Sequence, residues 1–168
     1  MSWSGHWHGF GPWIGAAFEY AKEGRRRPAH PNGPPMVSGP EDAKHQELLV
    51  QYRAAAAEFQ TGNVPPMMTG HWLMKKNQVS VDLTWTDAGG ALAWMRKQYE
   101  ANRPFEREDG RQAYADLDVK LDYAADVLPR GVDVCWVHYT SSKGLLSLSV
   151  VCCPNRFHPE ISCPLPPS

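Results

Sequence analysis

The chain has 168 residues, of which 42% are hydrophobic and 21% are charged, with a formal net charge of −1. This length suits one domain with its own core, and this composition excludes a wholly disordered chain. A net charge so close to zero would not steer the protein to nucleic acid or to an anionic membrane, so we expect neither as a partner.

The chain opens with a cluster of aromatic and imidazole side chains: Trp3, His6, Trp7, His8, Phe10 and Trp13. We predict that residues 1–10 form an aromatic arm. Trp is costly to leave in water and is favoured in binding sites, so this arm should either pack across the core as a lid or face a ligand or partner. A short helix over 12–22 is expected next, and clustered Pro, Gly and Arg predict a loop over 23–39.

The clearest helical pattern covers residues 40–61. Ser38 and Glu41 have the spacing of a capping box, and Gly62 is a candidate left-handed cap at the end. Apolar residues recur at intervals of three and four, as on one face of a helix: Leu48, Leu49, Tyr52, Ala55, Ala56 and Phe59.

A hairpin is predicted over 71–75 and 78–85, because Val79, Val81, Leu83 and Trp85 alternate with polar residues. Asp87 can then cap a helix that runs to about residue 101. Residues 113–128 fit both a strand and a helix; we favour a helix, because Ala and Asp are poor strand residues.

The last elements are a hairpin of 132–140 and 145–153 and a Pro-rich extended tail over 154–168. The expected turn places Cys135, Val137, Tyr139, Leu146, Leu148, Val150 and Cys152 on the core face. The predicted fold is therefore a single α+β domain over 1–168, with an antiparallel sheet of two hairpins, about four strands in all, packed against three to four helices.

Two groups of possible metal ligands occur. Cys153, His158 and Cys163 are spaced C-x4-H-x4-C, and His6 and His8 form an H-x-H pair. Structural zinc sites usually present close ligand pairs such as C-x2-C, which are absent here, and the adjacent Cys152 and Cys153 should point to opposite faces of a strand. We expect unpaired thiols, no metal and no cofactor.

The second face of the last hairpin could carry chemistry. Trp136, His138, Ser147 and Ser149 are expected together there, with His138 opposite Ser147. A His beside a hydroxyl can act as a general base, so an enzyme using His138, with Asp82 or His8 as a second proton-transfer group, is one hypothesis.

Three weaker patterns have ordinary explanations. The small residues 86–90 at a helix start favour capping over anion binding. The run Arg25-Arg26-Arg27 is typical of a solvated loop. The aspartates Asp116, Asp118, Asp122 and Asp126 gather as a solvated acidic face, with a basic partner as the alternative.

Four Cys without a signal peptide indicate free thiols and a cytoplasmic protein. The favoured function is a non-catalytic binding or accessory protein for a small aromatic or apolar ligand or a protein; the alternative is a small cofactor-independent enzyme. Oligomeric state stays open. The candidate ligand-binding residues are Trp3, His6, Trp7, His8, Trp13, Trp136, Ser147 and Ser149.

Overall fold

The computed structural model describes residues 2–29, 33–111 and 113–168. Its centre is one antiparallel four-stranded sheet in the order β2-β1-β4-β3. The strands are β1 (His6–Gly15), β2 (Thr84–Trp85), β3 (Val134–Tyr139) and β4 (Leu145–Cys153). The predicted α+β class with an antiparallel sheet is confirmed.

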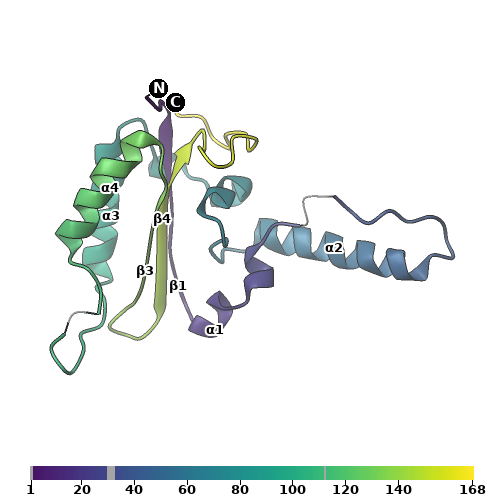
Figure 1. Cartoon of the computed structure of the whole chain (residues 1–168), viewed down its shortest axis with the longest axis horizontal. Coiled ribbons are helices and arrows are strands. Elements are labelled where there is room, and N and C mark those ends of the chain that lie inside the picture. The colour runs from purple at the N-terminus through teal and green to yellow at the C-terminus, as the bar shows by residue number, and fades with distance from the viewer. Residues whose placement is uncertain (1, 30–32, 112) are drawn as a thin grey trace.

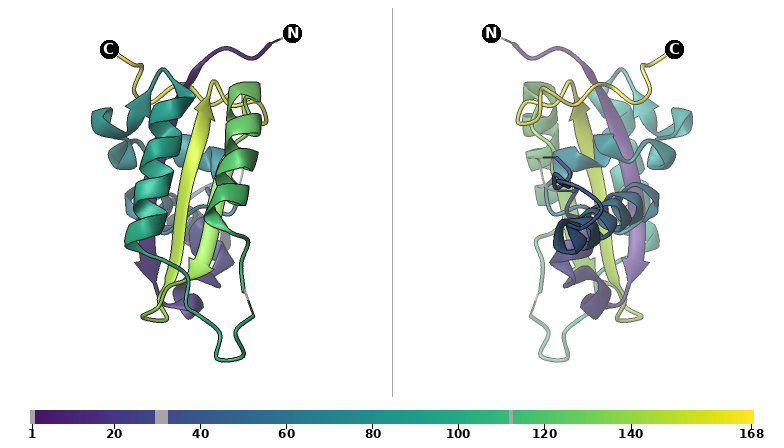
Figure 2. Two further views of the ribbon diagram at one scale, coloured as in Figure 1. Left: turned by 90° about the vertical axis from the view of Figure 1, so that its left-hand side faces the viewer. Right: turned by 90° about the vertical axis from the view of Figure 1, so that its right-hand side faces the viewer.

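Two helices, α3 (Ala88–Ala101) and α4 (Leu117–Val127), lie side by side on one face of the sheet (Figure 2). Asp87 caps α3 as expected, since its side chain accepts a hydrogen bond from the Gly89 N–H. The ambiguous segment is thus a helix. Met95, Ala124 and Leu148 are fully or almost fully buried between the helices and the sheet, and they belong to the larger of two cores.

The other face carries α1 (Ala17–Tyr20), the 3-10 helices η2 (Thr69–Met74), η3 (Lys76–Gln78) and η4 (Val81–Leu83), and the C-terminal tail. Here Phe10 stacks on Trp72 with ring centroids 4.9 Å apart. The predicted hairpin over 71–85 is therefore wrong in this segment: only Thr84 and Trp85 join the sheet. The Ser80 hydroxyl accepts a hydrogen bond from the Asp82 N–H, a local bond that favours a turn over a strand.

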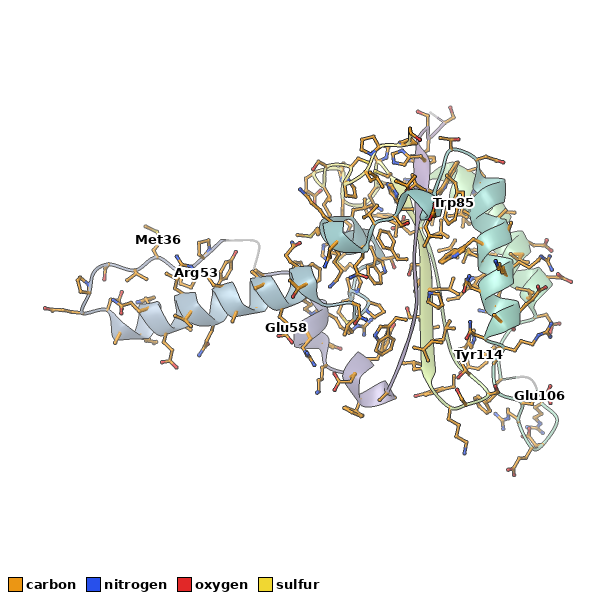
Figure 3. All side chains as sticks on the ribbon, turned by 180° about the vertical axis from the view of Figure 1, so that it is seen from behind. Met36, Arg53, Glu58, Trp85, Glu106 and Tyr114 are labelled. Atoms are coloured by element: carbon orange, nitrogen blue, oxygen red, sulfur yellow. The ribbon has the colours of Figure 1, made fainter. Side chains whose placement is uncertain are left out.

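Helix α2 (Ala43–Thr61) projects from the body with its preceding segment (Figure 1). Figure 3 shows Met36 and Arg53 on this projection, away from the packed side chains. Of the helix, only Phe59 is buried, so the predicted apolar stripe does not form a core face. Asp42 caps the start, and Gly62 has an extended φ of −71° instead of the left-handed conformation expected from the sequence.

Residues 6–10 of the predicted aromatic arm belong to β1, which lies between β2 and β4 in the interior of the sheet. The strand continues to Gly15 and takes up the first residues of the helix predicted over 12–22, of which α1 retains only four. Trp7, His8 and Phe10 are buried. An uncharged, aromatic segment can be covered on both faces, and its backbone groups are satisfied by two neighbouring strands.

The last hairpin forms, but its register differs by one residue from the prediction. His138 pairs with Leu146 and Val137 with Ser147. The loop contains three residues because Lys143 adopts a left-handed φ of 65° and the Thr140 N–H bonds to the Gly144 carbonyl. Because side chains alternate along a strand, this shift of one residue places the side chains of β3 on the opposite faces from those predicted relative to β4. Among the described helices, none is long and apolar enough to cross a bilayer.

Candidate metal centre

Four potential metal ligands converge at one end of the β1–β4 pair. His6 and His8 lie two residues apart on β1 and so share a face, and Cys153 on β4 pairs directly with His6. The tail returns Cys163 to the same place. One ligand atom from each of the four residues lies within 4.8 Å of all the others. The structure shows no other such group in the described residues.

The distances between the ligand atoms fit a compact site. The Nε2 atoms of His6 and His8 are 3.0 Å apart, and the Cys163 Sγ lies 3.3 Å from the first and 3.8 Å from the second. In a tetrahedral zinc site with the usual bond lengths, adjacent ligand atoms lie about 3.3 to 3.8 Å apart. The cluster therefore has about the size of a tetrahedral Cys2His2 site.

A hydrogen-bond chain fixes the orientation of the His8 ring. The Thr84 hydroxyl donates to the Ser80 carbonyl at 2.7 Å, and the His8 Nδ1 lies 2.9 Å from that hydroxyl. Because the hydroxyl proton is used, His8 Nδ1 carries a proton and donates it to Thr84. The lone pair of a neutral His8 is then on Nε2, the atom that faces the cluster, which is the outer-shell arrangement that metal-bound histidines use.

Burial favours the neutral forms of His6, His8 and Cys153 when no metal is bound. His8 is fully buried, and desolvation, with a smaller effect of His6, lowers its pKa to about 4. Desolvation also lowers the pKa of His6. Burial, and then the neighbouring Cys163, raise the pKa of the Cys153 thiol to about 12. A metal ion would therefore find neutral imidazoles, which are ready to bind, and would displace the proton of Cys153.

The segment between the two cysteines packs on the sheet end and on η2. The Asn155 side chain donates to both carboxylate oxygens of Asp133, at 3.1 and 2.9 Å. A Cβ added at Gly70 would lie 2.6 Å from the His158 ring and 2.9 Å from the Asn155 Oδ1. Only a residue without a side chain allows this close approach of the tail to η2.

The predicted metal ligands are thus regrouped. Cys153 and Cys163 meet the H-x-H pair, whereas His158 lies against His71 with ring centroids 4.5 Å apart. Cys152 and Cys153 point to opposite faces as expected, since they belong to different cores. The sequence grouped Cys153 and Cys163 with His158 and left His6 and His8 as a separate pair, whereas the sheet register places His6 opposite Cys153.

The structure does not bring the proposed proton-transfer groups together. His138 is fully buried on the face covered by α3 and α4, and its Nε2 lies 2.7 Å from the Asn102 carbonyl. His8 lies on the other face with Phe10, and Asp82 is exposed on η4. The one-residue change in register also separates Ser147 from His138, so the expected His–hydroxyl pair is not formed.

The predicted ligand-binding set divides in the same way. Trp7 is buried in the larger core and donates from Nε1 to the Leu128 carbonyl at 3.2 Å. Trp136 is buried in that core, whereas Ser147 and Ser149 are buried on the opposite face. Trp3 is partly buried against Trp7, at 5.3 Å between ring centroids, and Trp13 lies beside Tyr20. These side chains therefore do not line one common surface.

Sequence reasoning missed Thr84 and Ser80, which orient the His8 ring. No local pattern links them to His8, because the pairing of β2 with β1 brings Thr84 opposite His8. The ligands themselves are visible in the sequence as the H-x-H pair and the two cysteines.

Comparison with known proteins gives no match: no family model, no curated protein and no solved structure is similar to this chain.

Proposed function

We propose that this protein is a non-catalytic zinc-binding protein with a Cys2His2 centre formed by His6, His8, Cys153 and Cys163. The observation that carries the proposal is the convergence of four ligand atoms within 4.8 Å. The hydrogen bond that orients His8 through Thr84 supports it, because bound histidines are usually held in this way.

The donor set favours zinc over other common metals. Two thiolates and two imidazoles in a tetrahedral arrangement suit Zn²⁺, whereas Mg²⁺ and Ca²⁺ prefer oxygen ligands. Four protein ligands also fill the tetrahedral coordination sphere. Such a closed site favours a structural role, since catalytic zinc keeps one position open for water or substrate.

The proposed metal would join the start and the end of the tail segment 153–163. Residues His158, Glu160, Ile161 and Ser162 of this segment form one wall of a groove of about 1120 Å³, and Met67, Met68, Leu73 and Met74 contribute to the other. Methionine-rich walls adapt to apolar ligands. This groove is our candidate site for the small apolar ligand expected from the sequence, and zinc would hold its wall in place.

The proposal includes a cytoplasmic location. The structure has four free cysteines, and metal binding needs Cys153 and Cys163 in reduced form. The cytosol keeps thiols reduced, whereas an oxidising compartment would favour a disulfide between neighbouring thiols.

The test is metal analysis of protein purified under reducing conditions, followed by cobalt substitution. We expect one zinc ion per chain. The cobalt form should show the intense visible bands of tetrahedral Co²⁺ and a near-ultraviolet thiolate-to-cobalt transition. Cys163→Ser should weaken zinc binding by at least about a hundredfold, because one of the two thiolates is lost.

Cys135→Ser is the matched control, because Cys135 is exposed on β3 and lies outside the cluster. This variant should keep stoichiometric zinc and an unchanged cobalt spectrum. Reduced protein that takes up no zinc at micromolar concentration would overturn the proposal. Zinc retained equally by the Cys163→Ser variant would also overturn it, since the metal would then bind elsewhere.

A further inference from the structure

Cys153 and Cys163 are neighbouring free thiols at the two ends of one tail segment. Their Sγ atoms both belong to the cluster whose ligand atoms lie within 4.8 Å of one another. The two sulfurs of a disulfide lie about 2.05 Å apart, so a shift of less than about 3 Å is enough to join these two. The pair is therefore placed to form a disulfide as well as to bind a metal.

The two thiols differ in accessibility and in freedom to move. Cys153 is 1% exposed and is fixed in β4, where it pairs with His6 of β1. Cys163 is only partly buried, and the segment that carries it crosses the end of the sheet (Figure 2). Within the described chain, no main-chain hydrogen bond holds the backbone of Cys163. An oxidant from the solvent therefore reaches Cys163 first, and Cys163 is the residue that can move towards the other thiol.

The other two cysteines are poorly placed to compete for either thiol. Cys152 is next to Cys153 in the chain, but its side chain is fully buried in the core on the opposite face of the sheet. Cys135 lies opposite Ser149, which is four residues, or about 13 Å, from Cys153 along β4. Within one molecule, oxidation should therefore join Cys153 and Cys163 selectively.

We propose that Cys153 and Cys163 are a peroxide-sensitive pair, which forms a disulfide on oxidation and thereby releases the zinc ion. The release rests on the zinc centre proposed above, whereas the disulfide itself needs no metal. Disulfides in cytosolic proteins are usually transient and often serve in redox sensing, so a reversible pair is compatible with a cytoplasmic location.

The reaction takes two steps with hydrogen peroxide as the oxidant. The Cys163 thiolate attacks one peroxide oxygen: an S–O bond forms, the O–O bond breaks and hydroxide leaves. The Cys153 thiolate then attacks the sulfur of the Cys163 sulfenic acid: the S–S bond forms, the S–O bond breaks and a second hydroxide leaves. Two electrons pass from the sulfurs to the peroxide, and the two hydroxides take up two protons to give water. Zinc then retains only His6 and His8, because thiolates and not disulfide sulfurs are its ligands.

The disulfide should leave the tail in its place. It closes the same segment, 153–163, that the metal closes. The bonds from Asn155 to the Asp133 carboxylate and the close packing of His158 on Gly70 do not depend on either thiol. Oxidation is therefore expected to empty the metal centre without unfolding the wall of the groove.

The first test uses the full chain in a Cys135→Ser background, which removes the exposed thiol. Reduced, zinc-free protein treated with a small molar excess of hydrogen peroxide should lose the mass of two hydrogen atoms, and peptide mapping should find the Cys153–Cys163 disulfide. Cys152→Ala in this background is the matched control and should form the same disulfide, whereas Cys163→Ser should not form it. Sulfinic acid at Cys163 beside a free Cys153 would overturn the proposal, as would the absence of any disulfide.

The second test treats zinc-loaded protein with peroxide in the presence of a chromogenic zinc chelator. We expect one zinc ion released per disulfide formed, and renewed zinc uptake after reduction with dithiothreitol. Zinc retained by the disulfide-bonded protein would overturn the proposed release. The two proposals fail separately. A chain that binds no zinc but forms the disulfide refutes the metal centre and supports the reactive pair, whereas a zinc-binding chain that forms no disulfide refutes the reactive pair alone.

Discussion

Lys75 is a buried charge whose effect on stability can be measured by changing the pH. Its side chain is fully buried and its Nζ donates to the Gly62 carbonyl at 2.9 Å and to the Phe59 carbonyl at the end of α2. The Nζ also lies 4.1 Å from the centre of the Phe59 ring. Burial lowers the pKa of Lys75 from 10.5 to about 8.

The sign and size of the effect follow from these two values. Between about pH 8 and 10.5 the unfolded chain keeps the Lys75 proton and the folded protein loses it. The free energy of unfolding should therefore rise with pH through this window. At 1.36 kcal/mol per unit of pKa, the full rise is about 3 kcal/mol. Below pH 8 both states are protonated, and the cost of the buried charge is fully present.

Urea unfolding followed by tryptophan fluorescence, from pH 7.5 to 10.5, would measure this rise. Other groups ionise in the same range, so the quantity of interest is the difference between the natural protein and Lys75→Met. Lys76→Met is the matched control, because Lys76 is the exposed neighbour, and its curve should run parallel to that of the natural protein. Parallel curves for the natural protein and Lys75→Met would refute the reasoning.

Three further predictions concern the packing of the chain. Amide hydrogens of α2 before its last turn should exchange orders of magnitude faster than those of α3 in mass-spectrometric measurements, because the helix has little packing to protect it; equal protection would contradict this. Gly70→Ala should destabilise the protein by about 1–3 kcal/mol, and it should weaken zinc binding by displacing the tail. Gly39→Ala is the control: no atom lies within 4 Å of the new Cβ, so stability and zinc binding should both be unchanged. Trp7→Phe should lower the free energy of unfolding by about 2 kcal/mol, because it removes the hydrogen bond to the Leu128 carbonyl and leaves a cavity. Thermal or urea unfolding would measure this loss, and an unchanged midpoint would count against that bond.

Local patterns determined the elements whose signals lie in neighbouring residues. The cap at Asp87 and the helical spacing of residues 88–101 identified α3. The spacing of residues 113–128 fitted both a strand and a helix, and the poor strand propensity of Ala and Asp favoured the helix that α4 forms. The alternation of residues 132–153 identified the last hairpin, and the uncharged opening segment marked a part of the chain that is hard to leave in water. In these elements the pattern repeats with the period of the structure itself, so short-range information is sufficient.

Only the tertiary structure decided how those elements meet. A single left-handed residue, Lys143, sets the register of the last hairpin, and no periodicity in the strands reveals it. The partner of β1 is β4, more than a hundred residues later in the chain, and this pairing alone places His6 opposite Cys153. Metal ligands must converge in space, and here their spacing in the sequence does not predict that convergence. The H-x-H pair and the two cysteines were therefore visible from the beginning, but the site that joins them follows from the order of the strands.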